Sequence, residues 1–378
     1  MDKDILQWDE TIFKNEGMFE LDYIPESFIH RESQMQSLKF NIRPAMRGTR
    51  PVNTLCIGPP ATGKTTAVLK LFEEAEKHTS KVIPVYINCQ ITSTRHTIFS
   101  QIYKKVFGHA PPASGISFKK IFEEIAKRLL DEEIVVVVAL DDINYLFYEN
   151  EVNKVLYSIL RAHETYPGIK FGVIGILSDL KVGYSFDPRV DSIFLPDEIY
   201  FPLYSREEIY EILKNRVIYG FYPKVVSEEL LTDISDKVEK SGDLRVGIDL
   251  LRRAGFNAEK RGSRKISIDD VDNAYKKSGL IHLSYTISSL KKEEKALLKM
   301  IAGDDRSDKS KTKAGDLYKI FKEETNLSYT TFHEMLNKLD TVRLINMDFT
   351  GEGDRGRSRV ITLRYDVRDV LSRLPGDK

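Results

Sequence analysis

The segment NTLCIGPPATGKTTAVLKLF, Asn53 to Phe72, joins a short apolar run, a glycine-containing loop and a helical pattern. Its central part, GPPATGKT, matches the phosphate-loop pattern G-x-x-x-x-G-K-[ST] at every fixed position. The apolar run favours a strand and the following residues favour a helix, so backbone N–H groups and a helix N-terminus converge on whatever anion lies in the loop. A chance glycine turn would lack this context. The segment therefore predicts a nucleotide-phosphate site.

The residues of this loop have separate expected tasks. Gly58 and Gly63 permit the turn, and Lys64 is expected to reach the β- and γ-phosphates. The Thr65 hydroxyl is expected to bind Mg²⁺. We therefore predict ATP or ADP with Mg²⁺ as the cofactors. The predicted phosphate-binding residues are Gly58, Pro59, Pro60, Ala61, Thr62, Gly63, Lys64, Thr65 and Thr66.

A second apolar run, VVVVALDD from Val135 to Asp142, ends in two neighbouring carboxylates. A buried strand that ends in an acid, downstream of a phosphate loop, can hold the magnesium ion from the opposite side. We assign this role to Asp141. For Asp142 two interpretations stay open: a carboxylate that acts in hydrolysis, or a helix N-cap or loop carboxylate.

The chain divides into three predicted domains. Over residues 1–201, short β-branched runs alternate with helical patterns, which indicates a parallel sheet covered by helices. Residues 202–279 show amphipathic helical patterns, with Ser205 and Ser227 as N-caps, and predict an all-α lid. Residues 280–378 show three helical patterns followed by a two-stranded hairpin, the pattern of a winged helix. The polar stretch 303–313 is expected to be an inter-helix loop of this domain.

Composition limits the class of protein. The 378 residues include 57 basic and 57 acidic side chains, so any DNA-binding surface has to be local. The longest apolar run, Ile134 to Leu140, is too short to cross a bilayer, and the N-terminal sequence has no apolar signal core. Cys56 and Cys89 lie in apolar runs and are expected to be buried core residues. We expect a cytoplasmic protein without membrane partners.

The C-terminal domain carries a local excess of positive charge. The sequence RGRSRVITLR, Arg355 to Arg364, has four arginines and no acid, at the expected wing. Such a wing can enter a minor groove or follow phosphates, although a solvated charged hairpin is the alternative. The third helical pattern is expected to bury Phe332, Met335, Leu336 and Leu339, and His333 is expected at the surface or facing DNA. The predicted DNA-contacting residues of this domain are Ser328, Tyr329, Thr331, Lys338, Arg355, Arg357 and Arg359.

Several segments together resemble the archaeal replication-initiator branch of the AAA+ ATPases, relatives of the eukaryotic origin recognition complex and its loading factor. They are DYIPESFIHRESQM, GPPATGKTT, VVVVALDDINYLF, VIGILSDL, DPRVDSIF and SGDLRVGIDLLRRA, in the order of that family. The resemblance covers nearly the whole chain and ends in the winged helix that the family carries. The phosphate loop is shared by many ATPases, whereas the first segment, DPRV and the winged helix are more particular.

The resemblance implies roles for further residues. Tyr23, Ile24 and the residues up to Arg31 would surround the adenine, and Arg245 would be the lid arginine that senses the γ-phosphate. Arg189 would be an arginine finger that acts on a neighbour's nucleotide. On residue chemistry alone, both Arg189 and Arg245 could instead be solvated surface charges.

The family also has an insertion in the ATPase domain that touches DNA, and QIYKKVFGHAPPASGIS, residues 101–117, is similar to it. Lys104 and Lys105 would provide its positive charge. A solvated helix end and loop is the alternative interpretation.

Two positions depart from the family. Asp142 stands where the family usually has glutamate, and Ser178 stands where it usually has asparagine at the end of the fourth strand. Both side chains are shorter, and a misplacement of about 1 Å can lower a rate on the order of a hundredfold. We therefore predict a weak ATPase that uses the nucleotide as a switch, with Asp142, Ser178, Arg189 and Arg245 as its catalytic residues.

The predicted function is that of an ATP-dependent replication initiator, cytoplasmic and associated with the nucleoid. It would bind double-stranded origin DNA through its winged helix and the insertion, and would help to recruit the replicative helicase. Other initiator paralogues are further expected partners, and the two departures could mark a regulatory copy. The alternative is a nucleotide-switched signalling or transcription-regulatory ATPase whose winged helix contacts proteins.

Overall fold

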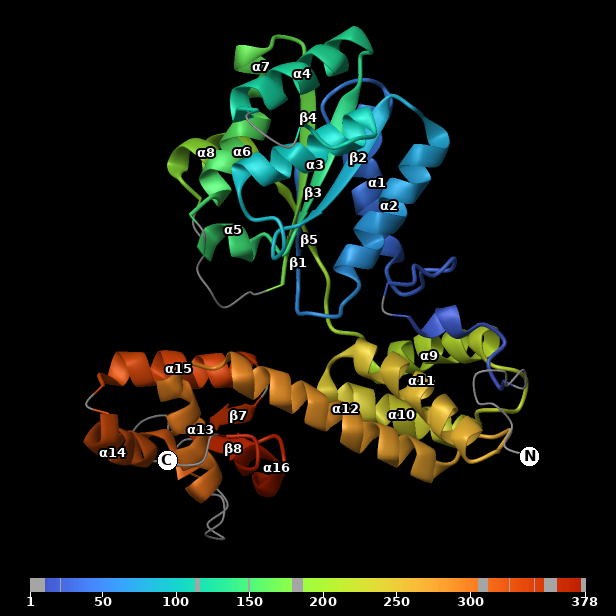
Figure 1. The fold of residues 1–378 in the computed structure, drawn as a ribbon, viewed down its shortest axis with the longest axis vertical. Helices are drawn as coiled ribbons and strands as arrows, with labels where there is room; N and C mark the ends of the chain where they lie inside the picture. Colours follow the sequence, from blue (N-terminus) through green and yellow to red (C-terminus); the bar gives the residue numbers. More distant parts are fainter. Residues whose placement is uncertain are drawn as a thin grey trace. The chain divides into compact units, whose positions relative to one another are not determined.

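The structure is a computed structural model that describes residues 11–20, 22–112, 116–148, 150–178, 186–304, 312–325, 327–342, 344–349 and 359–374. It forms two compact units, Met1–Ile268 and Asp269–Lys378 (Figure 1). The expected sheet and residues 202–268 of the expected lid lie in the first unit. Residues 269–279, which were expected in the lid, lie in the second unit with the winged helix, because helix α12 (Ile268–Ser289) runs across the expected boundary.

The first unit is built on a five-stranded sheet with the order β2-β3-β4-β1-β5, in which all described pairs are parallel. The strands are β1 (Thr54–Ile57), β2 (Val82–Asn88), β3 (Val135–Asp141), β4 (Lys170–Leu177) and β5 (Asp197–Tyr200). The helices of its sheet domain are α1 (Glu32–Met46), α2 (Lys64–His78), α3 (Arg95–Phe107), α4 (Phe118–Asp131), α5 (Asn144–Tyr148), α6 (Val152–Leu160), α7 (Ala162–Thr165) and α8 (Pro188–Phe194).

Strand β3 shows why this sheet needs helices on both faces. All seven of its residues are buried. Val136 and Val138 join a core that includes residues of α3, α4 and α6. Val135 and Val137 point to the other face and join a core with α1 and α2. The continuous apolar run is thus explained by burial on both sides (Figure 1).

The edge strand β5 was not among the strands predicted from the sequence. It has four residues, of which Ile199 is buried and the other three are exposed. An edge strand with one buried residue lacks the apolar run that marks the inner strands. Its pairing with β1 depends on tertiary contacts that the local sequence does not encode.

The lid consists of α9 (Arg206–Gly220), α10 (Glu228–Ser241) and α11 (Leu244–Lys260). The Ser205 and Ser227 side chains cap α9 and α10 by accepting hydrogen bonds from the backbone N–H groups of Glu208 and Leu230, so both N-cap predictions are confirmed.

An N-terminal strap, which we define as residues 11–20 and 22–31, packs onto this lid. It contains the short 3-10 helix η2 (Glu16–Phe19). Phe13 and Phe19 lie 4.8 and 4.7 Å from the Phe221 ring, measured between ring centroids. A Cβ on Gly220 would come within 2.4 Å of Phe19, and one on Gly255 within 2.4 Å of Phe13. The lid therefore closes tightly over the strap.

The second unit contains α12 (Ile268–Ser289), α13 (Lys292–Asp304), β6 (Thr312–Lys313), α14 (Ala314–Thr325), α15 (Tyr329–Thr341), β7 (Ile345–Phe349), β8 (Arg359–Leu363) and α16 (Val367–Leu371). Its antiparallel sheet has the order β6-β8-β7, so the predicted hairpin carries a third strand. That strand lies at the end of the predicted polar loop. Phe332, Leu336 and Leu339 are buried as predicted, and Met335 packs against them.

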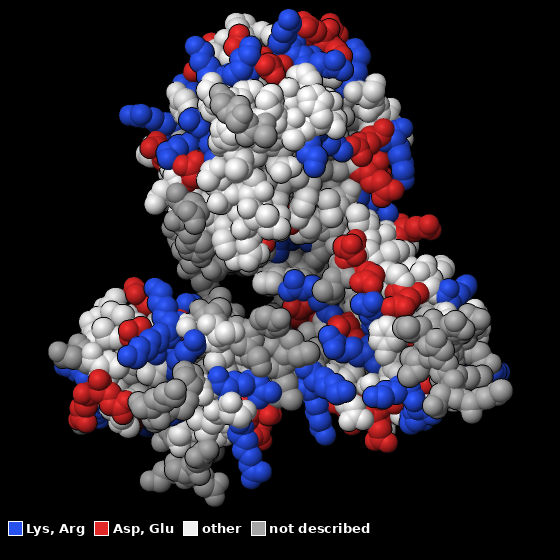
Figure 2. Space-filling model, in the orientation of Figure 1, with Lys and Arg blue, Asp and Glu red and all other residues white. Residues whose placement is uncertain are grey.

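Charge and hydropathy agree with the expectations from composition. In the view of Figure 2, lysine and arginine side chains alternate with acidic ones on both units. Cys56 and Cys89 are buried, which confirms their prediction as core residues. Among the described residues, no helix has the length and apolar character that a membrane span requires.

Candidate nucleotide-binding site

The glycines of the phosphate loop have no room for a side chain. A Cβ on Gly58 would lie 2.2 Å from the Phe201 carbonyl oxygen. Gly63 has a φ of 88° at the start of α2, and a Cβ there would lie 2.7 Å from the Tyr204 hydroxyl. Both positions therefore require glycine, and the loop is held between β1 and the residues that follow β5.

The ammonium group of Lys64 is held inside this loop. The side chain is buried, and its Nζ donates hydrogen bonds to the carbonyl oxygens of Gly58 (2.8 Å) and Pro59 (2.7 Å). Burial lowers the pKa of Lys64 to about 8, while the carboxylates of Asp141 and Asp142 oppose this shift. The loop thus concentrates positive charge at the N-terminus of α2.

The Asp141 carboxylate lies directly opposite the loop. Its Oδ2 accepts hydrogen bonds from the Thr65 hydroxyl (2.8 Å) and from the Tyr86 hydroxyl (2.6 Å). The pair predicted for magnesium, Thr65 and Asp141, is therefore in direct contact. Tyr86 was not predicted. The pKa of the Tyr86 hydroxyl is raised, mainly by burial and next by its hydrogen bond to Asp141.

Asp142 and Ser178 meet at the same edge of the sheet. The Ser178 hydroxyl donates to Asp142 Oδ1 at 3.3 Å. Asp142 has a φ of 51°, a left-handed conformation that is uncommon for a residue other than glycine. Burial and then the neighbouring Asp141 raise the pKa of Asp142, against the opposing bond from Ser178. Both residues line the cavity described next.

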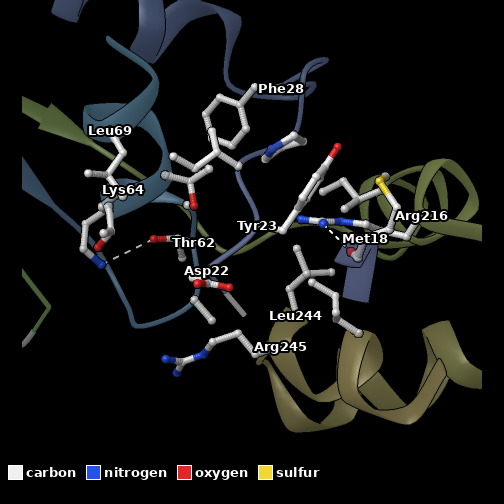
Figure 3. Close-up of a pocket in the computed structure, with 18 of the residues that line it drawn as sticks. Met18, Asp22, Tyr23, Phe28, Thr62, Lys64, Leu69, Arg216, Leu244 and Arg245 are labelled. Atoms are coloured by element: carbon white, nitrogen blue, oxygen red, sulfur yellow. Dashed lines mark hydrogen bonds between the residues drawn. The ribbon is translucent and has the colours of Figure 1, made fainter. Parts of the chain in front are cut away.

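A cavity of about 1170 Å³ lies in the first unit, between the strap, the loop and the lid (Figure 3). Tyr23 and Ile24 line it from the strap, and Arg245 lines it from the start of α11. The Arg245 guanidinium donates to the Asp243 carboxylate through Nε (3.0 Å) and Nη2 (2.8 Å). The other predicted residues that line this cavity are Pro60, Ala61, Thr62, Gly63, Lys64, Thr65, Thr66, Asp141, Asp142 and Ser178.

Arg31 does not line this cavity, although the resemblance placed it near the adenine. Its buried guanidinium donates to the carbonyl oxygens of His30 (2.7 Å), Thr62 (3.0 Å) and Pro202 (2.6 Å). It also lies 3.7 Å from the centroid of the Tyr204 ring. Arg31 thus ties the strap to the phosphate loop and to the residues that lead into the lid.

Replacing Arg31 with methionine is expected to lower the free energy of unfolding by about 3 kcal/mol, because three carbonyl oxygens lose a charged donor. Urea unfolding followed by circular dichroism measures the change. Arg43→Met, an exposed arginine of α1 in the same unit, is the control and should alter stability little. Equal stabilities of the two variants would contradict this role.

Two predicted groups lie away from the cavity. Arg189 is exposed at the start of α8, where its backbone N–H donates to the Asp187 side chain at 2.8 Å. Lys104 and Lys105 lie in the last turn of α3, and Lys105 forms an ion pair with Glu76 at 2.7 Å. Arg189 therefore does not contribute to the cavity of its own chain in this structure.

In the winged helix, Ser328 caps α15, and Tyr329 and Thr331 lie in its first turn. Lys338 donates to both carboxylate oxygens of the buried Glu294 at 2.8 Å, so its ammonium joins α15 to α13. This structural contact was not predicted.

The base of the wing meets α15 at His333. Arg359 of β8 contacts its Nε2, and its Nδ1 lies 3.0 Å from Asn337 Nδ2. His333 thus connects the predicted recognition helix to the wing strand. Arg355 and Arg357 lie outside the described residues.

Tyr86 and Arg216 are among the cavity residues that were not predicted from the sequence. A signal for Tyr86 existed, because β2 pairs beside β3 and polar residues at the carboxyl ends of parallel strands share one edge. Arg216 lies within the amphipathic helix α9, and nothing in the local sequence distinguishes it from a surface arginine.

Comparisons with known proteins cover all three domains. Family models match an AAA domain at residues 49–177, a Cdc6 AAA+ ATPase-type lid domain at residues 210–276 and a CDC6 C-terminal winged-helix domain at residues 285–373.

The chain is 53% identical to ORC1-type DNA replication protein 2 of Methanosarcina mazei, over 98% of both chains. It is 47% identical to ORC1-type DNA replication protein 6 of Halobacterium salinarum, over 99% of this chain and 100% of that one. The solved structure of the Aeropyrum pernix ORC1 protein in complex with DNA matches with a TM-score of 0.73 and 26% identity over 97% of each chain. The chain therefore belongs to the archaeal ORC1-type, Cdc6-related replication initiators of the AAA+ ATPases.

Proposed function

We propose that this initiator binds double-stranded origin DNA through its winged helix, under the control of a nucleotide held in the first unit. One observation carries the proposal: the same chain contains two sites. The first unit has the site of Lys64, Thr65 and Asp141, and the second unit has helix α15, whose first turn presents Ser328, Tyr329 and Thr331. The similarity to an ORC1 structure solved with DNA supports it. Lys104 and Lys105 would add a second contact to the duplex.

The residues present fit a magnesium nucleotide. Thr65 and Asp141 offer a hydroxyl and a carboxylate oxygen 2.8 Å apart, which are ligands that Mg²⁺ prefers. A bound Mg²⁺ would neutralise negative charge on the phosphates. Lys64 and the backbone N–H groups of the loop would hold the phosphates. The Arg245 guanidinium would leave the Asp243 carboxylate and bind the γ-phosphate instead. Arg189 would act on the nucleotide of a neighbouring initiator.

Hydrolysis is proposed to be slow because Asp142 and Ser178 are short and bonded to each other. Asp142→Glu combined with Ser178→Asn is expected to raise steady-state ATP turnover by roughly tenfold to a hundredfold, because the longer side chains reach further toward the phosphates. Release of phosphate from ATP measures it. Asp142→Asn is the control and should lower turnover further. No gain from the double variant would mean that these side chains do not limit hydrolysis.

The proposed partners are origin DNA, the replicative helicase and other initiator paralogues, in the cytoplasm at the nucleoid. The alternative, a nucleotide-switched regulator whose winged helix contacts proteins, differs in one property: it needs no affinity for duplex DNA. Selection of genomic fragments by the full chain with ATP and Mg²⁺, followed by sequencing, separates the two. An initiator is expected to enrich a few discrete sites, whereas no retention of duplex would favour the alternative.

A further inference from the structure

Arg216 of α9 is a buried cation at the wall of the cavity. It is 8% exposed, and its Nη1 donates to the carbonyl oxygen of Met18. Its Cζ lies 4.5 Å from the centroid of the Tyr23 ring. Burial lowers the pKa of Arg216. No carboxylate pairs with it among the residues that the structure describes.

Arg216 has fewer hydrogen-bond acceptors around it than the buried Arg31 has. Both side chains are buried. Arg31 donates to three carbonyl oxygens, whereas Arg216 donates, within the described chain, to the carbonyl oxygen of Met18. A guanidinium has five N–H donors and no acceptor. The other guanidinium nitrogens of Arg216 are not among the buried side-chain atoms that lack a partner in the described chain, so they face the cavity, where acceptor atoms of a ligand can reach them.

The position of Arg216 defines which part of a nucleotide would meet it. Figure 3 shows Arg216 with Tyr23 and Met18 at one end of the cavity, and Lys64 with Thr62 at the other. If the phosphates lie at Lys64, the end at Arg216 is left for the nucleoside. Nucleosides offer acceptors there, namely ring nitrogens of the base and oxygens of the ribose.

We propose that Arg216 is a nucleoside-binding residue, which donates hydrogen bonds from the lid to an acceptor on the base or ribose of the bound nucleotide. The inference rests on the proposed nucleotide binding and adds a contact that ties the lid to the nucleoside. Because Arg216 also holds the Met18 carbonyl, the same side chain joins the nucleotide, the strap and the lid.

The test compares ligands with and without a nucleoside. Calorimetry measures the affinity of the full chain for ADP and for pyrophosphate, which has neither base nor ribose. Arg216→Met is expected to weaken ADP roughly tenfold to a hundredfold and to leave pyrophosphate within about twofold of the wild type. Arg216→Lys keeps the positive charge but lacks the planar guanidinium group with its several donors. It is expected to weaken ADP binding several-fold without a comparable loss of pyrophosphate binding. Lys214→Met, an exposed neighbour on α9, is the control and should change neither affinity.

The outcomes separate the interpretations. Equal loss of ADP and pyrophosphate in both Arg216 variants, or no loss of ADP, would overturn the proposal, since a residue that contacts the nucleoside weakens ADP binding without weakening pyrophosphate binding. If Arg216→Met does not fold, Arg216→Lys gives the same comparison. A wild-type chain that binds neither ligand would instead refute nucleotide binding itself. With 2′-deoxy-ADP, a loss that disappears assigns the acceptor to the ribose 2′-hydroxyl, and a loss that persists assigns it to the base or to another ribose oxygen.

Discussion

Lys64→Met is expected to weaken ADP and ATP binding by at least about 100-fold, which corresponds to about 2.7 kcal/mol. Lys64 is the buried cation of the phosphate loop, and its ammonium group is already positioned by the carbonyl oxygens of Gly58 and Pro59. Each hydrogen bond from this charge to a phosphate contributes roughly 1.5–3 kcal/mol. Equilibrium dialysis with labelled ADP measures the loss. Lys77→Met, an exposed lysine in the last turn of the same helix, should bind like the wild type.

The pKa of Lys64, about 8, adds a pH dependence to this prediction. The ammonium form binds phosphate, so binding raises this pKa and takes up a proton above pH 8. From about pH 7, where the ADP phosphates are largely ionised, the affinity for ADP should therefore fall as the pH rises past 8, approaching a tenfold loss per pH unit. Lys64→Met should lack this decline. A wild-type affinity that is flat to pH 9.5 would contradict the assignment.

Changing Arg355, Arg357 and Arg359 to alanine is expected to weaken duplex binding at least about tenfold at 0.1 M salt. The three arginines lie in a stretch without acidic residues, in a chain whose total charge is zero. If each neutralises one phosphate, their loss should reduce the slope of log affinity against log salt by about 2.7, that is 0.9 for each charge. Fluorescence anisotropy of a labelled duplex, titrated at several salt concentrations, measures both quantities.

The control for the wing variant removes three positive charges from another part of the chain. Lys119, Lys127 and Arg128 are exposed on α4 of the first unit, and their change to alanine should leave affinity and slope unchanged. If both triple variants weaken binding equally, the effect is one of total charge and the wing is not the DNA contact. If the wing variant binds like the wild type, these arginines are not the DNA contact.

The sequence predicts the inner sheet and the meeting of the phosphate loop with Asp141, because both depend on local patterns. The run from Val135 to Asp141 is apolar on both faces, and the structure buries it between two layers of helices. The contact of Thr65 with Asp141 follows from the strand order, since the carboxyl ends of parallel strands meet at one edge. Strand β5 escapes prediction because one of its four residues is buried and because it forms by pairing with β1, which lies far away in the sequence.

The remaining features depend on contacts between distant parts of the chain. Arg31, Arg216 and Lys338 look alike in the sequence as single basic residues in helical or loop segments. In the structure, Arg31 binds backbone carbonyl oxygens, Arg216 lines the cavity and Lys338 pairs with the buried Glu294. Their different surroundings arise only when the strap meets the lid or α15 meets α13, and no local periodicity encodes these meetings.

Calorimetric titration of ATP into the full chain, with and without Mg²⁺, tests the central claim most directly. We expect binding at one site, tighter with Mg²⁺ than without it, and a loss of this magnesium effect in Asp141→Ala. Absence of ATP binding at a protein concentration of about 100 μM, or an affinity that Mg²⁺ and Asp141→Ala leave unchanged, would contradict the proposal that Thr65 and Asp141 hold a magnesium nucleotide.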